Sequence, residues 1–113
     1  MQTIVELPGF LKKASSLIQE QEKTRIINYL ASHPLAGNLM QGTGGIRKLR
    51  WSAHGKGKSG GVRVIYYYQN ELMPLFLLTI FGKGEKSNLT KSERNELAKF
   101  ISLLVKHYGG SNE

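Results

Sequence analysis

Residues 42–68 constrain the fold most strongly, because apolar and polar side chains alternate on either side of a glycine-rich segment. In residues 46–53, Leu49 and Trp51 share one face of an extended chain, while basic side chains share the other. Residues 62–69 are rich in β-branched and aromatic side chains, which favours a second strand whose even-numbered and odd-numbered side chains lie on opposite faces. We therefore expect two neighbouring strands around a loop.

Two further strands are expected outside this stretch. Residues 2–7 read as a short strand that ends at a Pro-Gly pair. Residues 74–81 are almost wholly apolar, which is typical of a central strand buried on both sides.

Three segments show the spacing of helices. Apolar residues recur at helical intervals through residues 10–19 and 26–31, and the second helix must stop before Pro34. The last helix begins with a capping box, in which Thr90 accepts from the Glu93 amide while the Glu93 side chain reaches back. Its apolar stripe runs through residues 97–108 and ends at two glycines.

The order of these elements predicts an α+β fold. We expect a small antiparallel sheet of about four strands, mixed at its edge, with two N-terminal helices and one C-terminal helix packed on one face. At 113 residues, the chain is expected to form a single domain over residues 1–113.

The charge of the chain points to an anionic partner. It has 16 Lys and Arg against 8 acidic residues, all of them Glu, and no acid lies between Glu22 and Glu71. Such a charge favours nucleic acid, an anionic membrane surface or an acidic protein, although basic residues also serve solubility alone. The clustering within residues 42–68 favours a polyanion site.

Other features narrow the class of protein. The chain has no cysteine, no apolar run of the roughly 20 residues that span a membrane, and no layout typical of a secretory signal. We therefore expect a cytoplasmic protein without a membrane partner. No His, Cys or Asp set has metal-ligand spacing, so neither a metal nor a cofactor is expected.

The segment GKGKS at residues 55–59 resembles a phosphate-binding loop only in part. Ser52 stands where that motif needs glycine, and a strand rather than a helix follows. A basic loop between strands fits the segment better than a nucleotide hydrolase does. His54 in this loop is either a group for proton transfer or a solvated histidine. Glu85 is either a proton acceptor or an ion-pair partner of Lys83 or Lys86, and we favour the ion pair.

Basic side chains are expected to converge on one face of the sheet. Lys48 and Arg50 share a strand face, Arg63 lies on the next strand, and Lys83 and Lys86 follow the third. These side chains either form a site or extend outward as an ordinary polar face. For Arg63, within an apolar strand, we expect a partner or a function.

Such a patch has the chemistry to cleave a phosphodiester without a metal. Clustered charge and partial burial lower the pKa of a lysine, which can then accept the proton of a ribose 2′-hydroxyl. Arginines stabilise the charge of the pentacovalent phosphorane. Among the tyrosines at 66–68, packing is expected for Tyr66 and Tyr68, which leaves Tyr67 to stack on a base.

The block GTGGIRKLRW…GKGKSGGVRVIYYY…LLTIFGKGEKSNLT resembles the RelE/ParE superfamily of toxins, most closely its HigB-type members. The resemblance covers residues 40–108 well and the N-terminal third loosely. It implies a RelE-like fold and a toxin of a type II toxin–antitoxin system. The implied activity is that of a ribosome-dependent endoribonuclease, which cleaves mRNA in the A site by 2′-hydroxyl attack and inhibits translation without a metal. The implied partners are mRNA, the ribosome and a helix-turn-helix antitoxin similar to HigA.

The resemblance also assigns roles to residues. Arg63 matches the strand arginine that stabilises the transition state, and Lys48 and Arg50 match two basic residues of the preceding strand. Lys83 and Lys86 lie around the basic motif after the last strand, and these five are the expected catalytic set. Contacts with RNA or the ribosome are expected from Arg47, His54, Lys56, Lys58 and Tyr67.

Two positions depart from the family pattern. Gly84 stands where the RelE prototypes have an arginine, so its role passes to Lys83 or Lys86. Thr90 stands near the position of a tyrosine. The general base therefore remains open among Lys48, Lys56, Lys58 and His54.

Two other functions fit the same sequence. A ParE-like poison of DNA gyrase would use the same fold without nuclease chemistry, and the basic cluster argues against it. A non-catalytic RNA-binding module would bind with steep salt dependence and leave no cleavage product.

Overall fold

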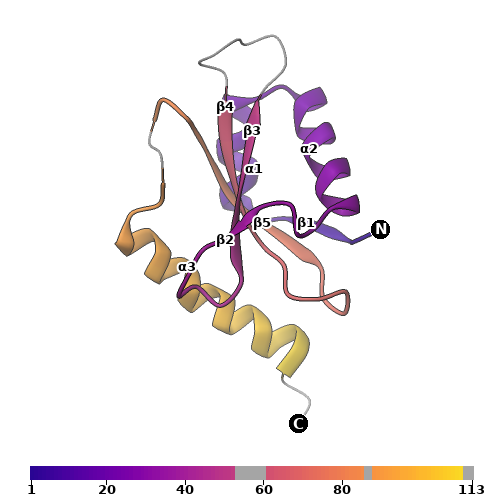
Figure 1. Cartoon of the computed structure of the whole chain (residues 1–113), viewed down its shortest axis with the longest axis vertical. Coiled ribbons are helices and arrows are strands. Elements are labelled where there is room, and N and C mark those ends of the chain that lie inside the picture. Colours follow the sequence, from indigo (N-terminus) through magenta and orange to yellow (C-terminus); the bar gives the residue numbers. More distant parts are fainter. Residues whose placement is uncertain (53–60, 86–87, 111–113) are drawn as a thin grey trace.

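The computed structural model describes residues 1–52, 61–85 and 88–110. These residues form a five-stranded sheet with three α-helices and a π-helical end (Figure 1). In chain order the elements are β1 (Ile4–Glu6), α1 (Pro8–Leu17), α2 (Glu20–Ser32), β2 (Asn38–Leu39), β3 (Ile46–Ser52), β4 (Gly61–Tyr67), β5 (Leu75–Gly82), α3 (Lys91–Val105) and the π-helix (Lys106–Gly110). The predicted α+β class is confirmed.

The strand order in the sheet is β1-β5-β4-β3-β2. β1 pairs with β5 in parallel, and the other pairs are antiparallel, so the sheet is mixed at one edge as expected. Five strands are present rather than about four. The additional strand, β2, has only two residues, which is too short to show an alternating pattern in the sequence.

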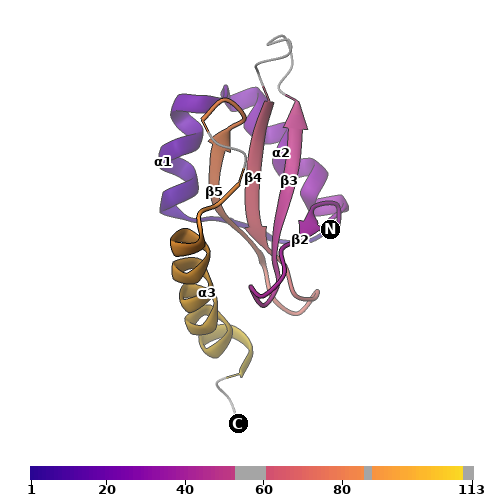
Figure 2. The same cartoon turned by 60° about the vertical axis from the view of Figure 1, so that its left-hand side comes forward.

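The helices cover both faces of the sheet, and the prediction that all three pack on one face is wrong. α1 and α2 pack on one face, where Phe10 of α1 and Ile26 of α2 meet Val64 of β4. α3 lies on the other face, where its Ile101 packs with Ile65 and other residues of a second core (Figures 1 and 2). The central strands are apolar on both sides, and a sheet of that kind needs helices on both faces.

β4 serves both cores through its alternation. Val64 and Tyr66 lie in the core under α1 and α2, while Ile65 and Tyr67 lie in the core under α3. The division of these residues between two faces agrees with the sequence prediction. A register shift between β4 and β5 falls between Ile65 and Tyr66.

The predicted capping box begins α3. Thr90 Oγ1 accepts from the Glu93 N–H at 3.0 Å, and Glu93 Oε1 accepts from the Thr90 N–H at 2.8 Å. These two bonds satisfy amides that a helix start otherwise leaves unpaired. They also set which residues of the first turn face the sheet.

A buried tyrosine holds the segment before β2. The Tyr66 hydroxyl donates to the Pro34 carbonyl and accepts from the Gly37 N–H, both at 2.8 Å. Gly37 lies so close that a Cβ there would be 2.9 Å from the hydroxyl and 3.0 Å from the Lys48 backbone. The segment leading into β2 is therefore fixed against β3 and β4.

We predict that Tyr66→Phe destabilises the protein by about 1–3 kcal/mol, because it leaves the buried Gly37 N–H and the partly buried Pro34 carbonyl without their partner. The matched control is Tyr68→Phe, since the Tyr68 ring is only partly buried against the same core. Chemical unfolding monitored by circular dichroism measures both variants. Equal stability losses in the two would contradict the role assigned to the Tyr66 hydroxyl.

Candidate nucleic-acid interface

Three cations extend from one face of the paired strands β3 and β4. Lys48 and Arg50 alternate with the inward residues of β3, and Arg50 lies directly opposite Arg63 of β4. Alternation puts them on the same face as Ile46 and Ile65, which belong to the core under α3. The sheet face that α3 covers thus continues into a basic surface.

Lys83, which follows the last residue of β5, joins this face. The register pairs Val62 with Gly82, and the Lys83 N–H donates to the Gly61 carbonyl at 2.9 Å. A Cβ on Gly61 would lie 3.7 Å from Lys83 Cδ, so the lysine stem lies on the face of β4 to which position 61 points, the same face as Arg63. Of the five residues expected to converge, Lys48, Arg50, Arg63 and Lys83 thus lie on one face, and Lys86 lies outside the described residues. We call these four residues the cationic face.

Arg63 lies within the ladder rather than at its end. Its register partners are Arg50 on one side and the buried Phe81 on the other. Its Nε is buried and has no hydrogen-bond partner among the residues that the structure describes. A buried guanidinium donor without a partner is unfavourable in the free protein and can be satisfied by an anion.

The pKa of Lys48 lies below its ordinary value of 10.5. Burial is the largest cause, and the charges of Arg50, Arg63 and Arg94 add to it in that order. Both effects disfavour the ammonium form. Lys48 therefore has a larger neutral fraction near physiological pH than a solvated lysine.

Sequence reasoning did not identify Arg94 as part of this site. Arg94 lies on the first turn of α3, where its N–H donates to the Thr90 carbonyl at 3.0 Å. A pocket of about 250 Å³ brings it together with residues of β2, β3 and the loop before α3, namely Asn38, Leu39, Met40, Gln41, Lys48, Arg50 and Asn88. The capping box predicts where α3 begins, but no sequence pattern predicts which strands that end approaches.

Tyr67 and Arg47, two of the residues expected to contact RNA, do not belong to the cationic face. Tyr67 is 1% exposed within the core under α3, burial raises its pKa, and its hydroxyl donates to Gln69 Oε1. A buried ring offers no face to a base, so the prediction for Tyr67 is wrong in this structure. Arg47 alternates onto the opposite face, where its Nη1 donates to the Gly37 carbonyl at 2.8 Å. It is thus separated from the cationic face by the sheet.

The remaining expected residues are His54, Lys56, Lys58 and Lys86, and all four lie outside the residues that the structure describes. Glu85 is described, and it forms the expected kind of contact with a different partner. Its Oε2 pairs with Lys13 of α1 at 3.2 Å, and its Oε1 accepts from the Gly82 N–H at 3.1 Å. Glu85 thereby ties the end of β5 to α1.

No group of three His, Cys, Asp or Glu side chains is gathered in residues 1–52, 61–85 and 88–110. His33 stacks on Tyr29 at the end of α2, with ring centroids 4.7 Å apart. No helix in these ranges has both the length and the apolar character to cross a bilayer.

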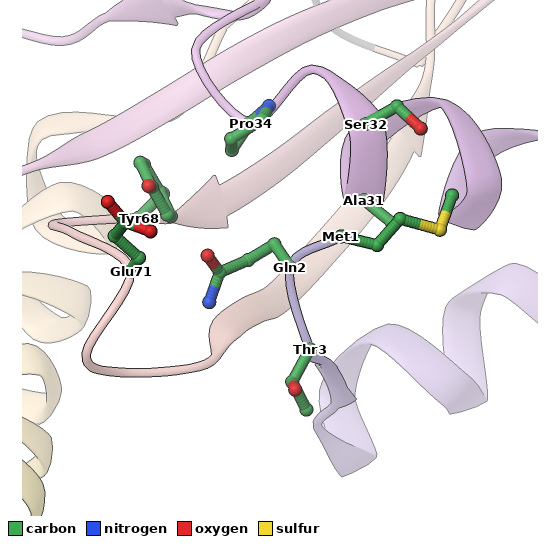
Figure 3. A pocket seen from close by; sticks show the side chains of 8 residues that line it. All are labelled: Met1, Gln2, Thr3, Ala31, Ser32, Pro34, Tyr68 and Glu71. Carbon is green, nitrogen blue, oxygen red and sulfur yellow. The ribbon is translucent and has the colours of Figure 1, made fainter.

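A pocket of about 540 Å³ lies near the N-terminus, apart from the cationic face. Figure 3 shows Met1, Gln2 and Thr3 on one side of it, with Tyr68 and Glu71 across from them. Glu71 is the charged side chain in its lining, and neither lysine nor arginine contributes to it. The pocket therefore does not suit a polyanion.

Four cations on one sheet face of a small α+β domain give the kind of charge that favours a polyanion as ligand. A family model adds a more specific assignment. The model described as "RelE toxin of RelE / RelB toxin-antitoxin system" matches residues 35–109, which include β2 to α3 and all four residues of the cationic face. The chain belongs to the RelE toxin family. Membership in this family implies an antitoxin partner.

We predict that Lys48→Met stabilises the protein at pH 7, because the fold lowers the lysine pKa and thus disfavours its charged form. Charged Lys48 destabilises the wild type fully below the pKa that the lysine has in the folded protein. The effect disappears as the pH rises toward 10.5, the ordinary pKa of a lysine. The Tm at pH 7 should therefore rise, and a gain of about 1 kcal/mol would move the Tm of such a domain by roughly 4–8 °C.

Thermal unfolding at pH 7 and at higher pH tests this, with Lys99→Met on the exposed side of α3 as the control. The gain should be specific to Lys48 and should shrink with rising pH. A loss of stability in Lys48→Met at pH 7 would show that the lysine is not held in an unfavourable state.

Proposed function

We propose that this RelE-family toxin is a ribosome-dependent endoribonuclease that cleaves mRNA in the A site and so inhibits translation in the cytoplasm. The observation that carries the proposal is the convergence of Lys48, Arg50 and Arg63 on one face of β3 and β4. Burial and the neighbouring arginines lower the pKa of Lys48 at this face. A lysine that is partly neutral beside fixed guanidinium groups suits proton abstraction next to a phosphate. Family membership supports the toxin role.

In the proposed reaction, neutral Lys48 Nζ accepts the proton of a ribose 2′-hydroxyl. The 2′-oxygen attacks the adjacent phosphorus, and Arg63 and Arg50 stabilise the negative charge of the phosphorane. The bond from phosphorus to the 5′-oxygen breaks, and the Lys83 ammonium donates a proton to that oxygen. The products are a 2′,3′-cyclic phosphate and a free 5′-hydroxyl.

Lys48 is the base in this proposal because burial and the neighbouring arginines lower its pKa. The alternatives left open by the sequence, His54, Lys56 and Lys58, lie outside the described residues and stay open. The reaction is proposed to need no metal, because four cations on one face repel a divalent cation and already supply the charge that it would bring. The proposed antitoxin is a helix-turn-helix protein similar to HigA, on the resemblance alone.

Arg63→Ala should lower cleavage about 10²–10³-fold, the usual effect of removing a donor that stabilises transition-state charge. Primer extension on a reporter mRNA in a reconstituted translation reaction measures the cut, with and without ribosomes. Lys12→Ala, an exposed substitution on α1, is the control and should cleave like the wild type.

Undiminished cleavage by Arg63→Ala would contradict the proposed role of Arg63 in the transition state. Intact mRNA in the presence of folded wild-type protein would contradict the nuclease proposal itself. DNA breaks upon expression would then favour a gyrase poison, while salt-dependent RNA binding without a product would favour a binding module.

Lys48→Arg should lower the single-turnover rate about 10²–10⁴-fold, because arginine keeps the charge but cannot accept the proton at accessible pH. The wild-type rate should rise with pH up to the lowered pKa of Lys48, as the neutral fraction grows. Rates between pH 6 and 9, with ribosomes held in excess, provide the measurement. A wild-type rate that is flat with pH, or an active Lys48→Arg variant, would assign the base elsewhere.

A further inference from the structure

We infer that the pocket between β2, β3 and the start of α3 is a second phosphate subsite, in which Arg94 binds a backbone phosphate next to the one cleaved. We call it the Arg94 pocket. The inference rests on the proposed function, since the ligand is an RNA strand that reaches the cationic face. It adds a substrate-contacting residue that lies on α3, apart from the strands that carry the cationic face.

The pocket has the size and the chemistry for a phosphate group. It measures about 250 Å³, and its charged lining consists of Lys48, Arg50 and Arg94, without an acidic side chain. Asn88 adds a neutral donor, because its Oδ1 already accepts the Leu89 N–H at 2.9 Å. The amide N–H groups of Asn88 are then the part of this side chain available to an anion.

The side chain of Arg94 has a buried donor that no described residue satisfies. Its side chain is partly buried, and its Nε is buried without a hydrogen-bond partner among the described residues. The capping box fixes the backbone of the turn that carries Arg94, and Arg94 lines the pocket from that turn. A phosphate would satisfy the unpaired donor with a charge-assisted bond.

The balance of charge favours two phosphates over one. Lys48 lies within the influence of Arg50, Arg63 and Arg94, all of which lower its pKa. A single phosphodiester carries one negative charge, which leaves most of this repulsion in place. With one phosphate at Arg63 and its neighbour at Arg94, each unpaired guanidinium gains an anion.

Direct binding tests the subsite without ribosomes or cleavage. The probe is a 5′-phosphorylated diribonucleotide with a 2′-O-methyl group, which carries two phosphates and cannot be cleaved. In ¹⁵N-labelled protein, we expect the Nε–H signals of both Arg63 and Arg94 to shift as the probe is added. Movement of the Arg63 signal alone, or of neither signal at saturation, would overturn the inference.

Variants then measure what Arg94 contributes. Arg94→Ala should weaken probe binding about tenfold and lower the slope of log K against log salt by about one. Arg94→Lys should retain most of the salt slope but less of the affinity, because it keeps the charge and loses the planar fork. The control is Lys99→Ala, on the same helix outside the pocket, and circular dichroism verifies that each variant is folded. Equal binding by Arg94→Ala and Lys99→Ala would also overturn the inference.

Cleavage kinetics separate this inference from the proposed function. In the ribosome assay, Arg94→Ala should raise the toxin concentration for half-maximal cleavage about tenfold, with a smaller change in the maximal rate. If the wild type cleaves and Arg94→Ala matches it in both parameters, only the subsite fails. If the wild type does not cleave but the Arg94 signal responds to the probe, the proposed reaction fails and the phosphate site stands.

Discussion

Arg50 and Arg63 lie directly opposite each other on β3 and β4, and much of the structure compensates for this contact. Like charges at opposed positions destabilise a sheet, and Lys48 and Arg94 add to the same repulsion. The strands remain paired because β4 is apolar elsewhere and packs on both faces, with Val64 on one side and Ile65 on the other. Stability is thus supplied by the two cores, while the cationic face opposes it, as is common for functional sites.

The two faces of the sheet have different tasks. The face under α1 and α2 holds the chain together, and there the Tyr66 hydroxyl fastens the segment before β2 to β4. One part of the face under α3 belongs to the second hydrophobic core, and another part carries the cationic face. Because β2 and the start of α3 line the Arg94 pocket together, the hydrogen bonds of Tyr66 and Thr90 position both of its walls.

Local patterns in the sequence predicted what depends on neighbours along the chain. The Thr90 capping box and the division of β4 between two faces are examples, since both follow from spacings of two to four residues. Which helix covers which face depends on packing between distant segments, so α3 was expected on the wrong side. For the same reason, the sequence did not indicate that Arg94 lies at the site. It predicted a neighbouring lysine as the ion-pair partner of Glu85, whereas the partner is Lys13, 72 residues away. Tyr67 was misjudged because alternation indicates a face but not whether a helix covers it.

The proposed site would supply a general base although no carboxylate among the described residues is available at it. The chain contains no Asp, and no carboxylate lies in the lining of the Arg94 pocket, so the proposed base is a lysine. The arginines that lower the pKa of Lys48 are those proposed to hold phosphate. When RNA binds, its negative charge offsets part of their repulsion and makes neutral Lys48 a stronger proton acceptor. The pKa of the base would thus be lowest when the site is empty and would rise when RNA brings a 2′-hydroxyl beside it.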